Sequence, residues 1–151
     1  MTALSALNWD ALGITALGLM LLGATWFDVR TRRIPNPIVG LGALASLAWT
    51  LSPAGPGLWM SLLGGGVAFL TFLVLHGLGW MGAGDVKLAG ATGLYFGPSS
   101  ALNLCLTIFI AGGVVALMWR FKSRASHPLP VPYGVAIALG TSWQVWRQAG
   151  L

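Results

Sequence analysis

Gly82-Ala83-Gly84-Asp85 is the stretch around which this chain is organised, because it sets an acid next to bare glycine backbone in a chain with very few acids. The other two acidic residues among 151 are Asp10 and Asp28. Asp28 and Asp85 both lie at the edges of apolar segments, where a carboxylate is costly to keep. We therefore expect these two acids to meet and to share one function.

The composition is that of a membrane protein. Hydrophobic residues make up 56% of the chain and charged residues only 7%, against roughly 25% charged residues in an ordinary soluble domain. A chain of this length has room for about six apolar spans and no separate soluble domain. We predict an all-α, polytopic integral membrane protein with about six transmembrane helices, forming a single domain over residues 1–151.

Apolar runs and helix-breaking residues predict where the spans begin and end. The predicted spans cover residues 11–27, 38–51, 58–78, 86–96, 101–119 and 131–146. The prolines in Thr31–Pro37 and the glycines in Gly79–Asp85 predict irregular connections. The Gly93 and Gly97 pair has the G-x-x-x-G spacing that is typical of close helix packing.

The basic residues orient these spans. They fall in short gaps between apolar runs, mainly at residues 30–33 and 120–124, which is the pattern of the positive-inside rule rather than of a nucleic-acid-binding surface. With the N-terminus outside, both clusters and Lys87 lie on the cytoplasmic side. The same topology puts Asp28 and Asp85 at the cytoplasmic face, so the two acids can meet.

Two neighbouring carboxylates suit a particular kind of hydrolysis. They cannot both ionise cheaply, so one keeps its proton and the pair titrates as a unit. The ionised member can activate a water while the protonated member donates to the peptide carbonyl, and neither a metal nor a cofactor is required. Gly82 and Gly84 would let an extended substrate backbone approach Asp85 closely.

Three stretches of the chain resemble the type IV prepilin peptidase family, membrane aspartic proteases of the GxGD class. They are Asp28–Asn36 (DVRTRRIPN), Gly82–Leu88 (GAGDVKL) and Pro132–Gly140 (PYGVAIALG). Together they cover nearly the whole chain, from the first span to the last. The resemblance implies that Asp28 and Asp85 cleave the leader of prepilins or prepilin-like proteins, in the bacterial inner membrane.

The chain also departs from the longer members of that family. Those members carry a cytoplasmic insertion, often with paired cysteines that bind zinc, which is linked to N-methylation of the mature pilin. Here Cys105 is the only cysteine and no loop is long enough. We therefore predict peptidase activity without methyltransferase activity and without a metal site, similar to the short forms that process tight-adherence (Flp-type) prepilins.

Two further residues are candidates for shaping the site. Asn36, between two prolines, can fix its loop through side-chain hydrogen bonds, and the resemblance suggests that it helps to shape the active site. Lys87 can lower the pKa of an acid or contact the substrate carbonyl at the cleavage site. Alternatively, it can simply extend towards the lipid phosphates. The particular prepilin, the residues that read its leader, and the oligomeric state stay open.

Two other classes of function also fit a membrane protein with two buried acids. Two intramembrane acids also suit a small proton-coupled transporter, although no internal repeat of the kind common in transporters is evident. A non-catalytic assembly factor would keep the acids only for packing or trafficking. Within the proteases, cleavage of the signal-peptide-peptidase kind is disfavoured by Ile34-Pro35-Asn36 and by the short chain.

Overall fold

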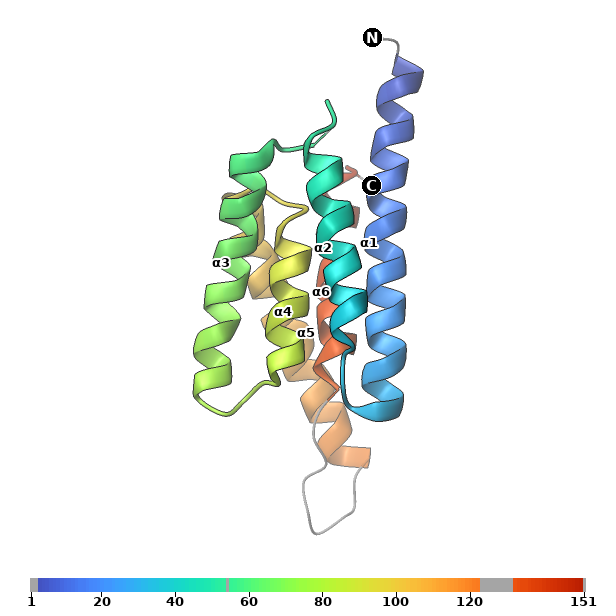
Figure 1. Cartoon of the computed structure of the whole chain (residues 1–151). Coiled ribbons are helices and arrows are strands. Elements are labelled where there is room, and N and C mark those ends of the chain that lie inside the picture. The colour runs from blue at the N-terminus through green and yellow to red at the C-terminus, as the bar shows by residue number, and fades with distance from the viewer. Residues whose placement is uncertain (1–2, 54, 123–131, 151) are drawn as a thin grey trace.

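The computed structural model describes residues 3–53, 55–122 and 132–150 and folds them into a helical bundle (Figure 1). Within these residues there are six helices and no strand. The helices are α1 (Ala3–Thr31), α2 (Asn36–Thr50), α3 (Leu58–Gly77), α4 (Ala83–Gly93), α5 (Pro98–Lys122) and α6 (Tyr133–Gln148). The prediction of an all-α fold is confirmed.

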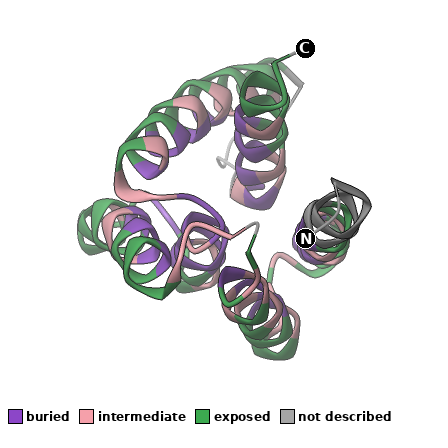
Figure 2. Ribbon diagram, turned by 90° about the horizontal axis from the view of Figure 1, so that it is seen from above, coloured by how far each residue is buried: buried purple, intermediate pink, exposed green. Residues whose placement is uncertain are grey.

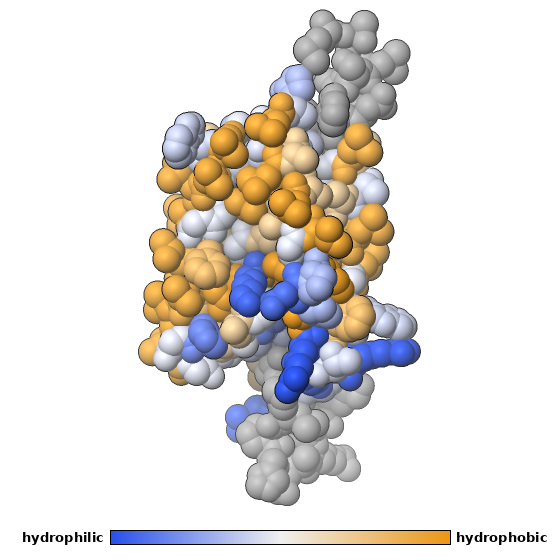
Figure 3. Space-filling view, viewed as in Figure 1, coloured by the Kyte–Doolittle hydropathy of each residue, from blue (hydrophilic) through white to orange (hydrophobic). Residues whose placement is uncertain are grey.

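The surface of the bundle is suited to lipid. Residues 11–31 of α1, the whole of α3, and residues 98–121 of α5 are long and apolar enough to cross a membrane. The buried faces of the helices point towards the middle of the bundle and the exposed faces outwards (Figure 2). Apolar residues cover most of the visible surface, and hydrophilic residues gather in its lower part (Figure 3). The chain is a polytopic membrane protein.

Successive helices run in alternating directions, which determines what meets at each end of the bundle. Both termini lie towards the upper end in Figure 1. The last turns of α1, α3 and α5 and the first turns of α2, α4 and α6 lie at the opposite end. Because Asp28 is in the last turn of α1 and Asp85 in the first turn of α4, we call this end the acid-bearing end.

Four helices, α1, α2, α4 and α5, begin earlier than the sequence predicted. Helix α2 starts at Asn36, inside the predicted loop, because Pro37 occupies the first turn, where its missing N–H costs no helical hydrogen bond. Helix α4 starts at Ala83, so the prediction of irregular backbone as far as Asp85 is wrong. Arg124 and Val131, in the predicted second basic cluster and at the predicted start of the last span, lie outside the described residues.

Helices α3 and α4 pack at glycines. A Cβ placed on Gly64 would lie 2.6 Å from the Gly93 carbonyl oxygen, and one placed on Gly93 would lie 2.7 Å from the Gly64 carbonyl oxygen. Ser61 of α3 also donates a hydrogen bond to the Leu94 carbonyl. The packing prediction is confirmed for Gly93 but wrong for Gly97, where a Cβ would meet nothing within 4 Å.

Helix α4 is the inner element of the bundle. It packs against α2, α3 and α6, and its side chains from Leu88 to Thr92 are buried. The core around it draws on all five other helices, through residues that include Met20, Val39, Phe72, Leu104 and Ile137. The N-terminal turn of α4, which carries Asp85, is therefore held on several sides.

Candidate active site

Asp28 is a buried acid that is held by a distant helix. Only 6% of its surface is exposed, although it lies near the end of α1. Its Oδ2 accepts a 2.8 Å hydrogen bond from the backbone N–H of Gly134, in the first turn of α6. Because a helix N-terminus carries partial positive charge, this position suits an acidic side chain.

Gly134 leaves room for this contact. A Cβ at position 134 would lie 2.8 Å from Oδ2 of Asp28, closer than real Cβ atoms approach other atoms, and 3.0 Å from its Cβ. The hydroxyl of Thr25, one turn before Asp28, donates a 3.4 Å hydrogen bond to the Gly134 carbonyl. Helices α1 and α6 are thus fixed to each other at the acid.

Asp85 lies on α4, close enough to Asp28 for the two carboxylates to interact electrostatically. Its Oδ2 accepts a 3.2 Å hydrogen bond from the backbone N–H of Gly82 and so caps the start of its own helix. Its Oδ1 is buried and has no hydrogen-bond partner among the described residues. The structure therefore brings together the two acids that the sequence singled out.

The segment before Asp85 is held by the end of α3. Gly79 has φ +76°, in the left-handed region that favours glycine, and closes α3 in a Schellman motif with hydrogen bonds from Gly79 N–H to the His76 carbonyl and from Trp80 N–H to the Leu75 carbonyl. Nδ1 of His76 lies 2.8 Å from the Met81 carbonyl oxygen and donates to it. These contacts fix the peptide unit that joins Met81 to Gly82.

The segment after Asp28 folds over the start of α4. Arg32 has φ +55°, and its N–H donates a 3.0 Å hydrogen bond to the Asp28 carbonyl as α1 ends. Its guanidinium group lies 4.8 Å from the centre of the Trp119 ring. The chain then brings Ile34 against Gly84, where an added Cβ would lie 3.3 Å from the Ile34 Cβ. Gly84 thus lets the α1–α2 connection lie close to α4.

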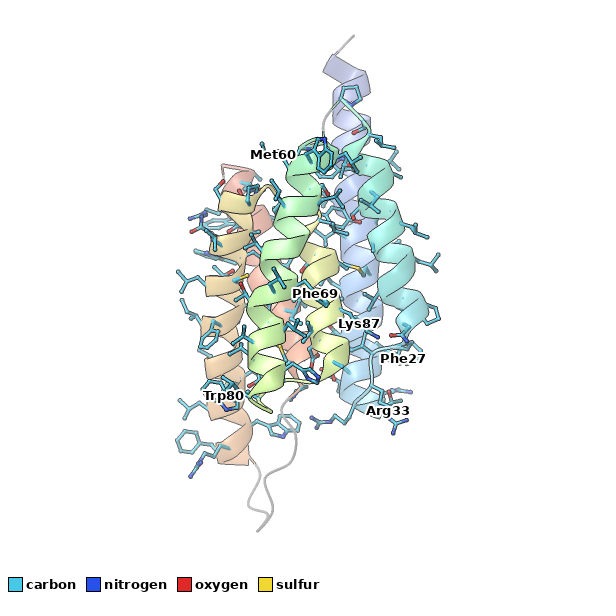
Figure 4. All side chains as sticks on the ribbon, turned by 60° about the vertical axis from the view of Figure 1, so that its left-hand side comes forward. Phe27, Arg33, Met60, Phe69, Trp80 and Lys87 are labelled. Carbon is cyan, nitrogen blue, oxygen red and sulfur yellow. The ribbon has the colours of Figure 1, made fainter. Side chains whose placement is uncertain are left out.

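Lys87 and Asn36, the two remaining candidates from the sequence, contact each other. Nζ of Lys87 donates a 3.1 Å hydrogen bond to Oδ1 of Asn36, which joins α4 to the first residue of α2. Both side chains are exposed. Figure 4 shows Lys87 in the lower half of the bundle, on α4 and facing α2. Among the described residues, neither side chain makes a hydrogen bond or ion pair with an aspartate, so the pair lies beside the acids rather than between them.

Sequence reasoning missed the role of Gly134. The signal was present in Pro132-Tyr133-Gly134, which was noted as part of a resemblance, but no pattern linked this segment to an acid 106 residues earlier. Arg32 was likewise expected only as one of several charges that orient the chain. Within the described residues, no group of three or more His, Cys, Asp or Glu side chains lies close enough together to hold a metal ion.

Comparison with known proteins assigns the chain to a family. Residues 15–117, which include both aspartates, match the model of the type IV leader peptidase family. A prepilin leader peptidase/N-methyltransferase of Xanthomonas campestris pv. campestris is 28% identical over 150 residues, which are 92% of this chain and 50% of that protein.

Proteins with the same name from Pectobacterium carotovorum and Dickeya chrysanthemi are each 29% identical and match 87% and 90% of the chain. These matches cover 49% and 52% of the two proteins, so the chain spans about half the length of the curated relatives it matches. No solved structure matched the chain significantly. Since the family model covers most of the chain, the protein belongs to the type IV leader peptidase family.

Proposed function

We propose that residues 1–151 form a single membrane-embedded aspartic endopeptidase domain that removes the leader peptide of type IV prepilins or prepilin-like proteins. One observation carries the proposal: Asp28 and Asp85, from two different helices, lie within electrostatic reach of each other at one end of a membrane bundle. The family match and the names of the relatives support this choice over a transporter or an assembly factor.

The proposed reaction uses the two carboxylates as an acid and a base that share one proton. The ionised carboxylate accepts a proton from water, and the oxygen of that water attacks the carbonyl carbon of the peptide bond. The protonated carboxylate donates its proton to the developing oxyanion, and a proton then passes to the leaving amine. The buried Oδ1 of Asp85, which has no described partner, is available to the water or to the substrate.

The backbone around Asp85 suits an extended substrate. Gly82 is exposed and Gly84 is half-buried, and neither places a side chain between Asp85 and an approaching strand. Basic residues gather at the same end of the bundle: Arg30 in the last turn of α1, Arg32 and Arg33 just after it, and Arg120 and Lys122 at the end of α5. The positive-inside rule then places this end at the cytoplasmic face of the bacterial inner membrane.

The test is to reconstitute the purified chain in liposomes with a candidate prepilin and to follow the mass of the intact substrate. We expect loss of the leader alone, undiminished by a metal chelator, because a carboxylate pair needs no metal for this chemistry. With S-adenosylmethionine present, we expect no methyl group on the product, because Cys105 is the only cysteine in these 151 residues and paired cysteines cannot form here.

An intact substrate, in liposomes where the chain is folded, would refute peptidase activity. A proton flux across the same liposomes in the absence of substrate would instead favour the transporter. Cleavage that stops on chelation would refute the metal-independent mechanism, while a methylated product would refute only the absence of methyltransferase activity.

We predict that Lys87 and Asn36 act as one positioning unit. Lys87→Met and Asn36→Ala should each lower kcat/KM by about 3- to 10-fold, because each breaks the hydrogen bond that ties α4 to α2 beside the acids. The double variant should be no worse than the poorer single variant, since both changes remove the same contact. Cleavage rates of the four proteins, measured at equal membrane levels, check this. Additive losses would show that the two side chains act separately.

A further inference from the structure

Arg32 has an unusual backbone conformation where α1 ends. Among the described residues, it is the only residue other than glycine with a positive φ, at +55°, and its N–H donates to the Asp28 carbonyl. Glycine is the usual residue at this place in a helix cap, because a side chain is crowded in the left-handed region. Residues held in such conformations are concentrated at functional sites. An arginine at this position therefore points to a use for its side chain.

The guanidinium group of Arg32 contacts α5 and acts on Asp28. It lies 4.8 Å from the centre of the Trp119 ring, whose electron-rich face attracts a cation. Its positive charge also acts on the carboxylate of Asp28. Because the N–H of Arg32 is bound to the Asp28 carbonyl, the cation and the acid belong to one turn of the chain. The Trp119 ring thus keeps a positive charge near one of the two acids.

The other charged or titratable side chains that the structure describes at the acid-bearing end are engaged elsewhere or exposed. Nζ of Lys87 donates to Asn36, and Nδ1 of His76 donates to the Met81 carbonyl. The set is completed by three exposed arginines and one half-buried tyrosine: Arg30, Arg33, Arg120 and Tyr133. Of the cations at this end, Arg32 is the one with a marked effect on Asp28.

The two carboxylates consequently lie in unequal electrostatic surroundings. Asp28 accepts a hydrogen bond from the Gly134 N–H and is near the cation of Arg32, and both contacts favour its ionised form. The charge that acts on Asp85 is instead that of the Asp28 carboxylate, which favours the protonated form of Asp85. Oδ1 of Asp85 has no hydrogen-bond partner among the described residues, so it can carry that proton.

We propose that Arg32 is a positioning residue, which makes Asp28 the ionised carboxylate and leaves the shared proton on Asp85. This assignment rests on the proposed peptidase function. Asp28 then takes a proton from water as the water oxygen bonds to the peptide carbonyl carbon, and Asp85 gives its proton to the carbonyl oxygen. As the C–N bond breaks, Asp28 passes its proton to the leaving amine, and Asp85 takes a proton back from a hydroxyl of the new carboxyl group. Both acids return to their starting forms.

The small number of acids makes this assignment directly measurable. The chain contains three aspartates and no glutamate, so protein made with aspartate that carries carbon-13 in its side-chain carboxyl group gives three such signals by nuclear magnetic resonance. Asp10→Asn, Asp28→Asn and Asp85→Asn each remove one signal and so assign all three. In the wild type, in liposomes without substrate, we expect Asp28 to lose its proton at least about one pH unit below Asp85.

Three substitutions separate the charge of Arg32 from its backbone role. Arg32→Gln removes the charge, Arg32→Lys keeps it, and Arg32→Gly removes it while relieving the crowding at positive φ. Arg30→Gln is the matched control, because the guanidinium group of Arg30 also lies over a tryptophan ring, 4.1 Å from the centre of Trp26, but the side chain is exposed.

Loss of the charge at position 32 should change the pH dependence of cleavage. In Arg32→Gln and Arg32→Gly, the titration of Asp28 and the acidic limb of kcat/KM should both move up by about one pH unit, because the ionised form of Asp28 loses its cation. At pH values below that limb, kcat/KM should fall about 10-fold. Arg32→Lys and Arg30→Gln should titrate and cleave as the wild type does.

Two results would overturn the assignment. One is a wild type in which Asp85 ionises at a lower pH than Asp28. The other is an Arg32→Gly protein that matches the wild type in both the titration and the pH profile, as expected if Arg32 only caps α1. The titration needs no substrate. A wild type that titrates as expected but cleaves no prepilin would therefore contradict the proposed function, and not the effect of Arg32 on Asp28.

Discussion

Asp28→Asn and Asp85→Asn should each reduce leader cleavage by at least about 10³-fold, with the protein still inserted at wild-type levels. The asparagine amide keeps the shape of the side chain but can neither accept a proton from water nor donate a carboxylic proton, and general acid–base groups contribute about 10²- to 10⁴-fold each. Because the proposed pair acts as a unit, the double variant should be hardly worse than either single variant. Rates from the mass of the intact substrate, under single-turnover conditions, check this.

Asp10→Asn is the matched control for these two variants. Asp10 is the remaining acid of the chain and lies on the same helix as Asp28, eighteen positions earlier and so about 27 Å along the helix axis. We expect it to cleave at the wild-type rate. Full activity in either Asp28→Asn or Asp85→Asn would show that the reaction does not need that carboxylate. It would also refute the mechanism in which the two acids share a proton.

Gly134→Ala should lower kcat/KM by about 10²-fold, an effect transmitted entirely through Asp28. The added methyl group would have to occupy space 2.8 Å from Oδ2 of Asp28, so the carboxylate or the first turn of α6 must move. A misplacement of about 1 Å at a reacting group can cost this much. The binding of an uncleaved substrate should change far less than the rate, and comparing its Kd with kcat separates the two effects.

The control for Gly134→Ala is Gly66→Ala, in α3, where an added Cβ would meet nothing within 4 Å. Both variants replace a helical glycine by alanine, so they share any general effect on helix stability. Gly66→Ala should retain full activity. Wild-type cleavage by Gly134→Ala would show that the position of Asp28 set by α6 does not matter for the reaction.

Much of the fold could be predicted from hydropathy and from the alternating directions of successive membrane spans. Apolar runs indicated the six helices. Because successive helices run in opposite directions, Asp28 and Asp85 were expected at the same end of the bundle. The beginnings of α2 and α4 were harder, because Pro37 was read as a loop residue although it also suits a first helical turn. At Asp85, the cap to Gly82 could have been recognised from its three-residue spacing.

The rest of the site depends on contacts between segments that are far apart in the chain. The hydrogen bond from Gly134 to Asp28 and the one from Lys87 to Asn36 each join helices that no local pattern pairs. Likewise, the close contact at Gly84 is made with Ile34, on another connection. Such contacts depend on how the helices pack against each other in three dimensions. Hydrophobic periodicity and composition do not specify this packing.

The modest lengths of α2, α4 and α6 have a consequence for the surrounding lipid. With 15, 11 and 16 residues, these helices are about 23, 16 and 24 Å long, whereas a bilayer core is about 30 Å thick. Hydrophobic mismatch of this kind is relieved by local thinning of the bilayer. The headgroup region and its water would then lie closer to the first turn of α4. Water, the second reactant of hydrolysis, could therefore reach Asp85 without a dedicated channel.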